Sequence, residues 1–128
     1  MSTLVAVGLG GAVGAVARWM ATDWVRRLLG DGFPWGTLSV NVVGSLALGM
    51  TAVWIQTLPA SSQTRAFLAI GLLGSFTTFS TFSLEAVELL RHGAPLRAGG
   101  YVLASIAASL MAVAVGAVLA SSLLSGRS

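Results

Sequence analysis

Five hydroxyl residues and three phenylalanines follow one another directly after a stretch that contains Gly71 and Gly74. They are Phe76, Thr77, Thr78, Phe79, Ser80, Thr81, Phe82 and Ser83. Glycine and hydroxyl residues both weaken an α-helix, so we expect the backbone to break here. A broken helix inside a membrane frees carbonyls that bind cations and amides that bind anions. The phenylalanines alone would suit an aromatic core stripe on one helix face, but their neighbours favour a functional break.

Other polar side chains occur singly in apolar surroundings. Asn41 lies within an apolar run, where an amide is costly unless it forms hydrogen bonds. It either joins neighbouring helices or donates N–H groups to a polar pathway. Tyr101, Ser105 and Ser109 are spaced four residues apart and would stack along one helix face. A lone serine commonly bonds its own backbone, whereas three stacked hydroxyls favour a polar track.

Two charged residues also lie within apolar runs. Arg18 either snorkels to lipid headgroups or has a structural or electropositive role at a vestibule. Glu85 follows the expected break, and we expect it to pair with an arginine or to line a vestibule. The chain has one histidine and no cysteine. No metal-ligand spacing and no nucleophile–base pair is visible, so we predict that the protein is not an enzyme.

The elements that must hold these residues are membrane helices. Of the 128 residues, 55% are hydrophobic and 9% are charged, against roughly a quarter charged in soluble domains. A soluble domain this small cannot bury so much apolar surface. Four apolar runs are long enough to cross a bilayer, at about 4–28, 37–58, 66–90 and 99–124. We predict an all-α membrane protein, a single four-helix transmembrane domain over residues 1–128 with the third helix broken mid-membrane.

The first run carries small residues at helical spacing. Ala6, Gly10 and Gly14 are four residues apart and would let two helix backbones approach closely in lipid. The glycines resemble a nucleotide-binding loop only loosely, because no strand precedes them. We therefore interpret them as packing residues.

Arginines at the helix ends give a weak topological bias. The net charge is +3, and the arginines are spread singly or in one pair, which excludes a nucleic-acid partner and indicates contact with lipid headgroups. Those beside the first and third connectors are Arg26, Arg27, Arg91 and Arg97, and those on the opposite side are Arg65 and Arg127. The usual rule would place both termini outside the cytoplasm. So small a bias also permits insertion in both orientations.

Four stretches together resemble the Fluc (CrcB) family of fluoride channels. They are Gly10-Gly11-x-x-Gly14-Ala15-x-x-Arg18, Gly36-Thr37-Leu38-x-Val40-Asn41-x-x-Gly44-Ser45, Gly71-x-x-Gly74-x-Phe76-Thr77-Thr78-Phe79-Ser80-Thr81-Phe82 and Tyr101-x-x-x-Ser105. The similarity covers nearly the whole chain. Ser75 and Leu46 depart from the glycine and phenylalanine common in the family, and neither departure removes an expected ligand.

The resemblance implies a fluoride-selective channel that exports fluoride passively across the bacterial inner membrane. It implies a dual-topology homodimer of antiparallel subunits with two pores. The implied pore residues are Asn41, Phe79, Phe82, Thr81, Tyr101, Ser105 and Ser109. It further implies a structural sodium ion at the dimer centre, bound by the backbone carbonyls of Gly74 and Thr77.

The chemistry of these side chains is compatible with fluoride. The ion is small and strongly hydrated, and amide and hydroxyl donors together with the positive edges of phenylalanine rings can replace its water shell. One alternative is a small proton-coupled four-helix exporter, which needs a carboxylate within the membrane. Glu85 would be that carboxylate, although it lies off-centre. A second alternative is a structural assembly subunit, which would carry no ion flux.

Overall fold

The computed structural model describes residues 2–126, and the regular elements within that range are all helices. They are α1 (Thr3–Leu29), α2 (Trp35–Thr57), α3 (Ser62–Arg65), η1 (Ala66–Leu73), α4 (Gly74–Phe76), α5 (Phe79–Arg91) and α6 (Pro95–Ser125). The segments α3, η1, α4 and α5 follow one another along a single span. Four spans of the described chain are long and apolar enough to cross a membrane. The predicted all-α membrane architecture is therefore confirmed.

Two of the spans begin about one turn earlier than the hydrophobic pattern indicates. The third begins at Ser62, because the Ser61 side chain accepts a hydrogen bond from the Thr64 amide at 3.1 Å and caps the helix. The fourth begins at Pro95, which stands in the first turn of α6. Proline fits there because its missing N–H would have had no helical partner.

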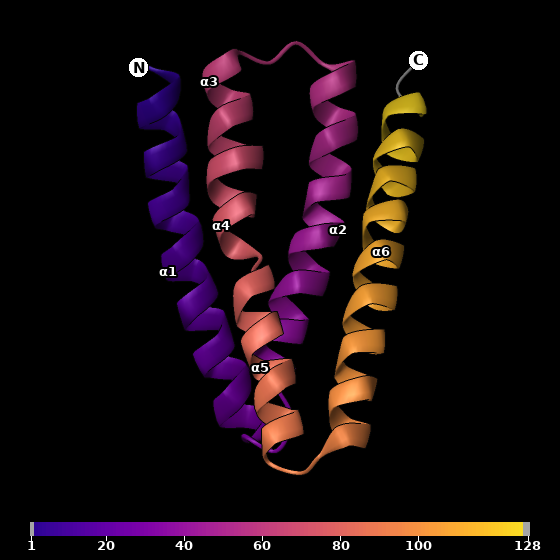
Figure 1. The fold of residues 1–128 in the computed structure, drawn as a ribbon. Helices are drawn as coiled ribbons and strands as arrows, with labels where there is room; N and C mark the ends of the chain where they lie inside the picture. Colours follow the sequence, from indigo (N-terminus) through magenta and orange to yellow (C-terminus); the bar gives the residue numbers. More distant parts are fainter. Residues whose placement is uncertain (1, 127–128) are drawn as a thin grey trace.

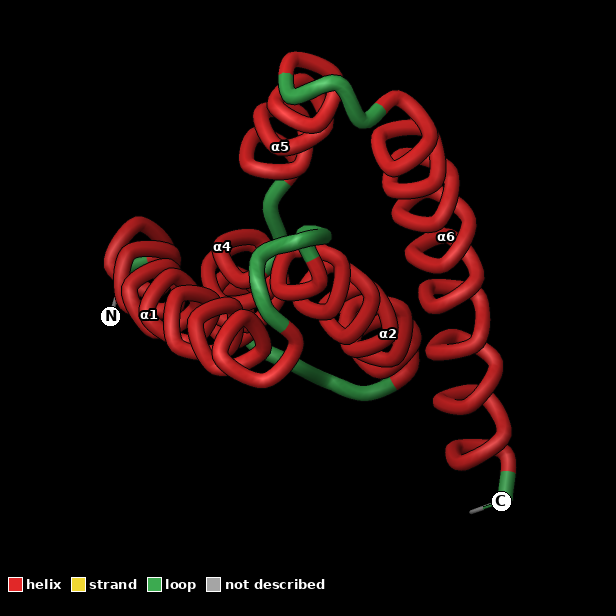
Figure 2. The backbone as a smooth tube through the Cα atoms, turned by 90° about the horizontal axis from the view of Figure 1, so that it is seen from below, coloured by secondary structure: helices red, strands yellow, loops and turns green. Residues whose placement is uncertain are grey.

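Successive spans run antiparallel (Figure 1). The start of α1, the end of α6 and the α2–α3 connector lie at one end of the molecule, and the other two connectors lie at the opposite end. The arginines beside the first and third connectors therefore share one end, as expected; Arg127 lies outside the described residues. The bundle is not closed, since α6 contacts α2 and α5 while α1 contacts α2, η1 and α4 (Figure 2).

Glycines set the two closest helix contacts. A Cβ atom at Gly10 or Gly14 would collide with the backbone of η1. A Cβ at Gly49 would collide with the backbone of α6, and one at Gly116 with that of α2. Ala6, one turn before Gly10, is fully buried. The packing role predicted for the small residues of the first run is thus confirmed.

The third span breaks at two threonines. Thr77 (φ −87°, ψ 156°) and Thr78 (φ −149°, ψ 122°) are extended, and helix lies on both sides. The break falls within the stretch of glycines and hydroxyl residues where it was expected, at its hydroxyl part: Gly71 lies inside the π-helical segment η1 and Gly74 begins α4. It falls at the threonines and not at the glycines because the threonine hydroxyls offer the backbone bonds that compete with the helix.

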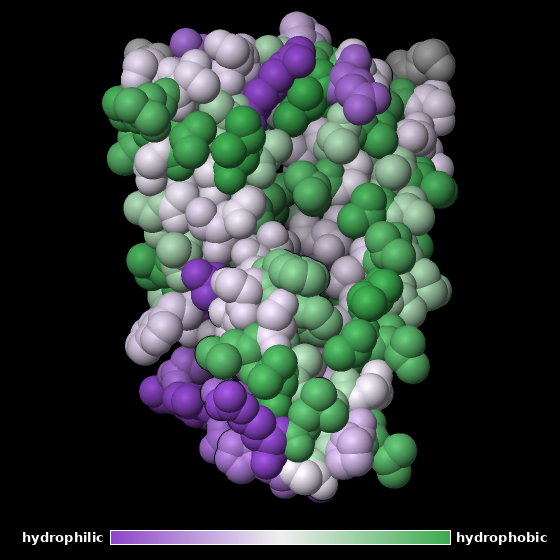
Figure 3. Space-filling model, viewed as in Figure 1, coloured by the Kyte–Doolittle hydropathy of each residue, from purple (hydrophilic) through white to green (hydrophobic). Residues whose placement is uncertain are grey.

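Apolar side chains cover most of the outer surface. Large exposed residues occur along the length of α1 and α6, among them Leu9, Val13, Leu103 and Leu110. In Figure 3 the strongly hydrophilic residues gather mainly at the ends of the molecule, and the middle is largely apolar. Such a surface is stable in a bilayer and not in water. The chain is a multi-pass membrane protein.

Candidate functional site

Asn41 on α2 holds the break in place. Its Nδ2 donates to the Thr78 carbonyl at 3.0 Å, and its Oδ1 accepts from the Thr78 amide at 2.8 Å. A single side chain thus satisfies both backbone groups of an extended residue that has left the helix. Asn41 therefore joins two spans, the first of the two roles left open by the sequence. An amide nitrogen has two N–H donors and this bond uses one, so the pore role stays a prediction.

Thr78 caps the second half of the span. Its Oγ1 accepts from the Thr81 amide at 3.2 Å and donates to Thr81 Oγ1 at 3.1 Å. On the other side of the break, Thr77 Oγ1 donates to the Leu73 carbonyl at 3.1 Å. The polar side chains at the break are thus bonded within the chain.

Two hydroxyls of α6, unlike those at the break, have no hydrogen-bond partner in the described chain. Tyr101 is 0% exposed and Ser105 is 6% exposed, and neither hydroxyl has a hydrogen-bond partner among the described residues. Ser109, one turn further along, is half-buried. Leaving a buried hydroxyl without a partner costs roughly 1–3 kcal/mol. The α6 hydroxyl track (Tyr101, Ser105 and Ser109) therefore has unused hydrogen-bonding capacity at its two buried hydroxyls.

Aromatic rings link this track to the break. The Phe82 ring is buried, with its centroid 5.2 Å from that of Tyr101 and 5.5 Å from that of Phe79. Phe79 is 78% exposed. Phe76 lies beyond the break, with its ring near Gly44 on α2. The alternative of one aromatic stripe on a single helix face does not hold for Phe76, because the extended threonines interrupt the helical repeat.

A cavity of about 500 Å³ opens at the end of the molecule that carries the first and third connectors. Thr37 and Glu85 are among the residues that line it, and Thr37 Oγ1 donates to Glu85 Oε1. Thr37 also lies close to the Tyr101 hydroxyl, without the geometry of a hydrogen bond, and Glu85 acts on that hydroxyl through its charge. The cavity therefore adjoins the α6 hydroxyl track, and Glu85 stands on its wall with a threonine as partner.

Arg18 contacts the break from α1. Its Nε donates to the Ser75 carbonyl at 2.9 Å, at the C-terminal end of the first half of the span. A cation is favourable at that end, because the last carbonyls of a helix carry partial negative charge. Of the roles left open by the sequence, this contact is structural rather than a snorkelling one.

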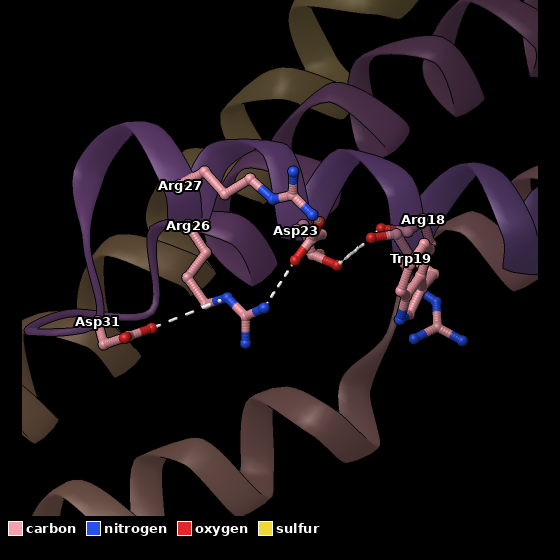
Figure 4. Close-up of polar contacts among 7 residues, drawn as sticks. Arg18, Trp19, Asp23, Arg26, Arg27 and Asp31 are labelled. Carbon is pink, nitrogen blue, oxygen red and sulfur yellow. Dashed lines mark hydrogen bonds and ion pairs between the residues drawn. The ribbon is translucent and has the colours of Figure 1, made fainter.

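The carboxylates nearest to Arg18 on α1 and its following loop are already paired (Figure 4). Asp23 bonds Arg26 at 2.6 Å and Arg27 at 2.8 Å, and Asp31 lies 3.9 Å from Arg26. Arg18 stands apart from this cluster along the helix. Its side chain is therefore directed to the break and not to an ion pair in the described chain.

Comparisons with known proteins agree on one family. The profile of the family described as "CrcB-like protein, Camphor Resistance (CrcB)" matches residues 5–117. The chain is 44% identical over 120 residues to the "Fluoride-specific ion channel FluC" of Rhizobium meliloti (strain 1021), covering 93% of this chain and 96% of that protein. It is 47% identical over 125 residues to the protein of the same name from Chelativorans sp. (strain BNC1), covering 97% and 100%.

The chain belongs to the CrcB family.

Three residues beside the expected site of this CrcB protein were not assigned to the site from the sequence. Thr37 is buried and bonds Glu85, and its place one turn before Asn41 on α2 was the available signal. Phe33 lies edge-on to Tyr101, with ring centroids 5.4 Å apart at 82°, and it gave no signal because it lies in a connector. Thr78 was counted only as one hydroxyl of the run. Its capping role depends on where the helix restarts.

Proposed function

We propose that this protein is a fluoride channel that exports fluoride passively across the bacterial inner membrane. The observation that carries the proposal is the buried, unpartnered pair of hydroxyls of Tyr101 and Ser105 beside the Phe82 ring. This pair occurs in a chain 44% and 47% identical to proteins named for fluoride-specific conduction. Hydroxyl donors in a dry site are what a small, strongly hydrated anion requires in place of water.

The ion path would run from the cavity near Thr37 along the α6 hydroxyl track. Tyr101, Ser105 and Ser109 would supply O–H donors in turn, with Thr81 nearby on α5. Several moderate sites in series let an ion enter without being trapped. Asn41 has one further N–H to contribute beyond its bond to Thr78.

The rings would complete the coordination. Phe82 touches the track at Tyr101, and Phe79 extends the aromatic contact to the surface of the subunit. The hydrogen-bearing edge of a phenylalanine ring is electropositive and can face an anion where water is absent. Phe79 is 78% exposed in one subunit, so its ring would pack against a second subunit.

A second copy, inserted in the opposite orientation, would form an antiparallel homodimer with two pores. Two observations support it: the exposed Phe79 ring and the exposed Gly74 at the break. Irregular backbone at membrane depth is tolerated only where protein or a wet cavity covers it. The arginine bias is weak enough to allow both orientations.

The break also suits the structural sodium ion implied by the family. Carbonyl oxygens released by an unwound segment are good ligands for a monovalent cation. The carbonyls of Gly74 and Thr77 would hold it, since Thr77 is extended at the break and Gly74 begins the short helix α4 that ends there. When bound, the ion would supply positive potential for anions and join the two subunits.

Passive efflux from proteoliposomes tests the proposal. Fluoride should leave loaded liposomes without a proton gradient, and chloride should stay behind. Phe79→Ile should abolish fluoride efflux while leaving the dimer intact, and Phe67→Ile, in η1 on the other side of the break, is the matched control. Equal fluoride and chloride flux, or no flux at all, would contradict the channel.

The proton-coupled exporter has one observation in its favour, the half-buried Glu85. Its carboxylate sits on the wall of an open cavity and bonds Thr37. An exporter requires efflux that stops when the proton gradient is collapsed and that Glu85→Gln removes. Efflux that persists in both experiments favours the channel.

A further inference from the structure

The amide of Thr78 is diverted from its helical partner. In an uninterrupted α-helix each amide donates to the carbonyl four residues earlier, so Thr78 would bond Gly74. Here it donates to Asn41 Oδ1 at 2.8 Å. The Gly74 carbonyl therefore loses the donor that would otherwise occupy it, and Gly74 is itself exposed.

The amide of Thr81 is diverted in the same way. Its helical acceptor would be the carbonyl of Thr77. It donates to Thr78 Oγ1 at 3.2 Å, because Thr78 is the N-cap of α5. Two side chains, on Asn41 and on Thr78, thus bond the two amides that would serve the carbonyls named for sodium in an uninterrupted helix.

Other carbonyls at the break accept hydrogen bonds from side chains or from turn amides. The Ser75 carbonyl accepts from Arg18 at 2.9 Å, and the Thr78 carbonyl accepts from Asn41 at 3.0 Å. The Leu73 carbonyl accepts from both the amide and the hydroxyl of Thr77, each at 3.1 Å. Side chains and turns therefore occupy these oxygens and leave the Gly74–Thr77 pair without its helical donors.

We propose that Asn41 and Thr78 are positioning residues for the cation: they hold two backbone amides away from the carbonyls of Gly74 and Thr77. This inference rests on the proposed function, which places sodium at those carbonyls. An N–H group and a cation bind the same lone pairs of a carbonyl oxygen, so an amide that bonds a ligand carbonyl competes with the cation. Losing either diversion should return an amide to a carbonyl and weaken cation binding.

A purely structural role makes a different prediction. If Asn41 and Thr78 only satisfied the broken backbone, removing them would lower stability equally with and without sodium. If they position the carbonyls, the loss should depend on sodium. The informative measurement is therefore the sodium dependence of stability, and not ion flux alone.

The experiment uses matched variants of the full chain purified in detergent. Thr78→Val removes the hydroxyl at constant shape, and Thr78→Ser keeps it. Asn41→Leu removes both amide contacts. Ser83→Ala is the control, because the Ser83 hydroxyl bonds the Phe79 carbonyl at 2.9 Å within α5 and diverts no amide. Each protein is desalted into N-methyl-D-glucamine buffer, assayed for retained sodium by atomic emission, and titrated with sodium while its thermal midpoint is followed.

The wild type, Thr78→Ser and Ser83→Ala should behave alike, either retaining sodium or gaining stability with the same half-saturating concentration. Thr78→Val and Asn41→Leu should lose retained sodium, or need roughly tenfold more sodium, as expected when one hydrogen bond competes with the ion. Unchanged sodium binding in a folded Thr78→Val protein would overturn the inference. A wild type that neither retains nor responds to sodium would overturn both this inference and the proposed sodium site, while fluoride efflux would still test the channel itself.

Discussion

The break in the third span and the hydroxyl track on α6 are both rich in polar groups, yet they differ in how those groups are bonded. At the break, Asn41, Thr78 and Arg18 each contact a named partner within the chain. On α6, the Tyr101 and Ser105 hydroxyls are buried and have no partner among the described residues. The polar groups of the first region are satisfied within the described chain, and the two buried hydroxyls of the second are not.

This difference in hydrogen bonding suggests that the break is part of the structural scaffold and that the α6 hydroxyl track is a binding surface. Polar groups that are already paired contribute to stability, and removing them leaves unsatisfied partners behind. Buried polar groups without partners cost stability, and a bound guest is one explanation for their presence in a native protein. Mutations at the break should therefore reduce stability and flux together, whereas mutations on α6 should reduce flux alone.

The largest effect is expected from Asn41→Ala. It leaves the Thr78 amide and carbonyl without partners, at roughly 1–3 kcal/mol for each buried group. Fluoride efflux should fall about 100-fold or more, as expected for a barrier raised by some 3 kcal/mol. Thermal unfolding and liposome efflux measure the two quantities. Full stability combined with lost flux would show that Asn41 is not part of the scaffold.

Arg18→Leu should have the next largest effect. It removes a bond from a charged donor to the Ser75 carbonyl, which contributes roughly 1.5–3 kcal/mol. The thermal midpoint should fall, and flux should fall with it. Arg27→Leu is a useful control, because Arg27 pairs with Asp23 at the exposed end of α1 and does not reach the break. Equal losses in the two variants would contradict the specific role of Arg18.

Ser105→Ala should reduce fluoride efflux without reducing stability. Its hydroxyl makes no hydrogen bond to lose, so stability should be unchanged or slightly higher. Efflux should fall roughly tenfold, the effect of one lost donor to an anion. Ser121→Ala, at an exposed position near the end of the same helix, should leave both unchanged. A marked loss of stability in Ser105→Ala would place this residue with the scaffold.

Tyr101→Phe should give the smallest change. The ring keeps its contacts with Phe82 and Phe33, at 5.2 and 5.4 Å, and only the hydroxyl is lost. We expect about a threefold fall in efflux, because the remaining serines can partly replace one donor. Stability measured by thermal unfolding should be preserved. Unaltered efflux would remove the Tyr101 hydroxyl from the ion path and leave its ring as a packing element.

The sequence by itself determined the membrane class, the four spans and the presence of a break. These follow from local quantities: the low fraction of charged residues, the length of each apolar run and the density of hydroxyls after Gly71 and Gly74. The spacing of Gly10 and Gly14 alone likewise predicted a close helix contact. Each inference needs only neighbours along the chain, so a linear pattern suffices.

Only the tertiary structure decided which polar groups are paired. Asn41 and Thr78 are far apart in sequence, and nothing local indicates that one amide side chain would satisfy both backbone groups of the other. The same holds for Arg18 and the Ser75 carbonyl. A hydrogen bond depends on distance and direction between atoms of different spans, and these are set when the helices pack.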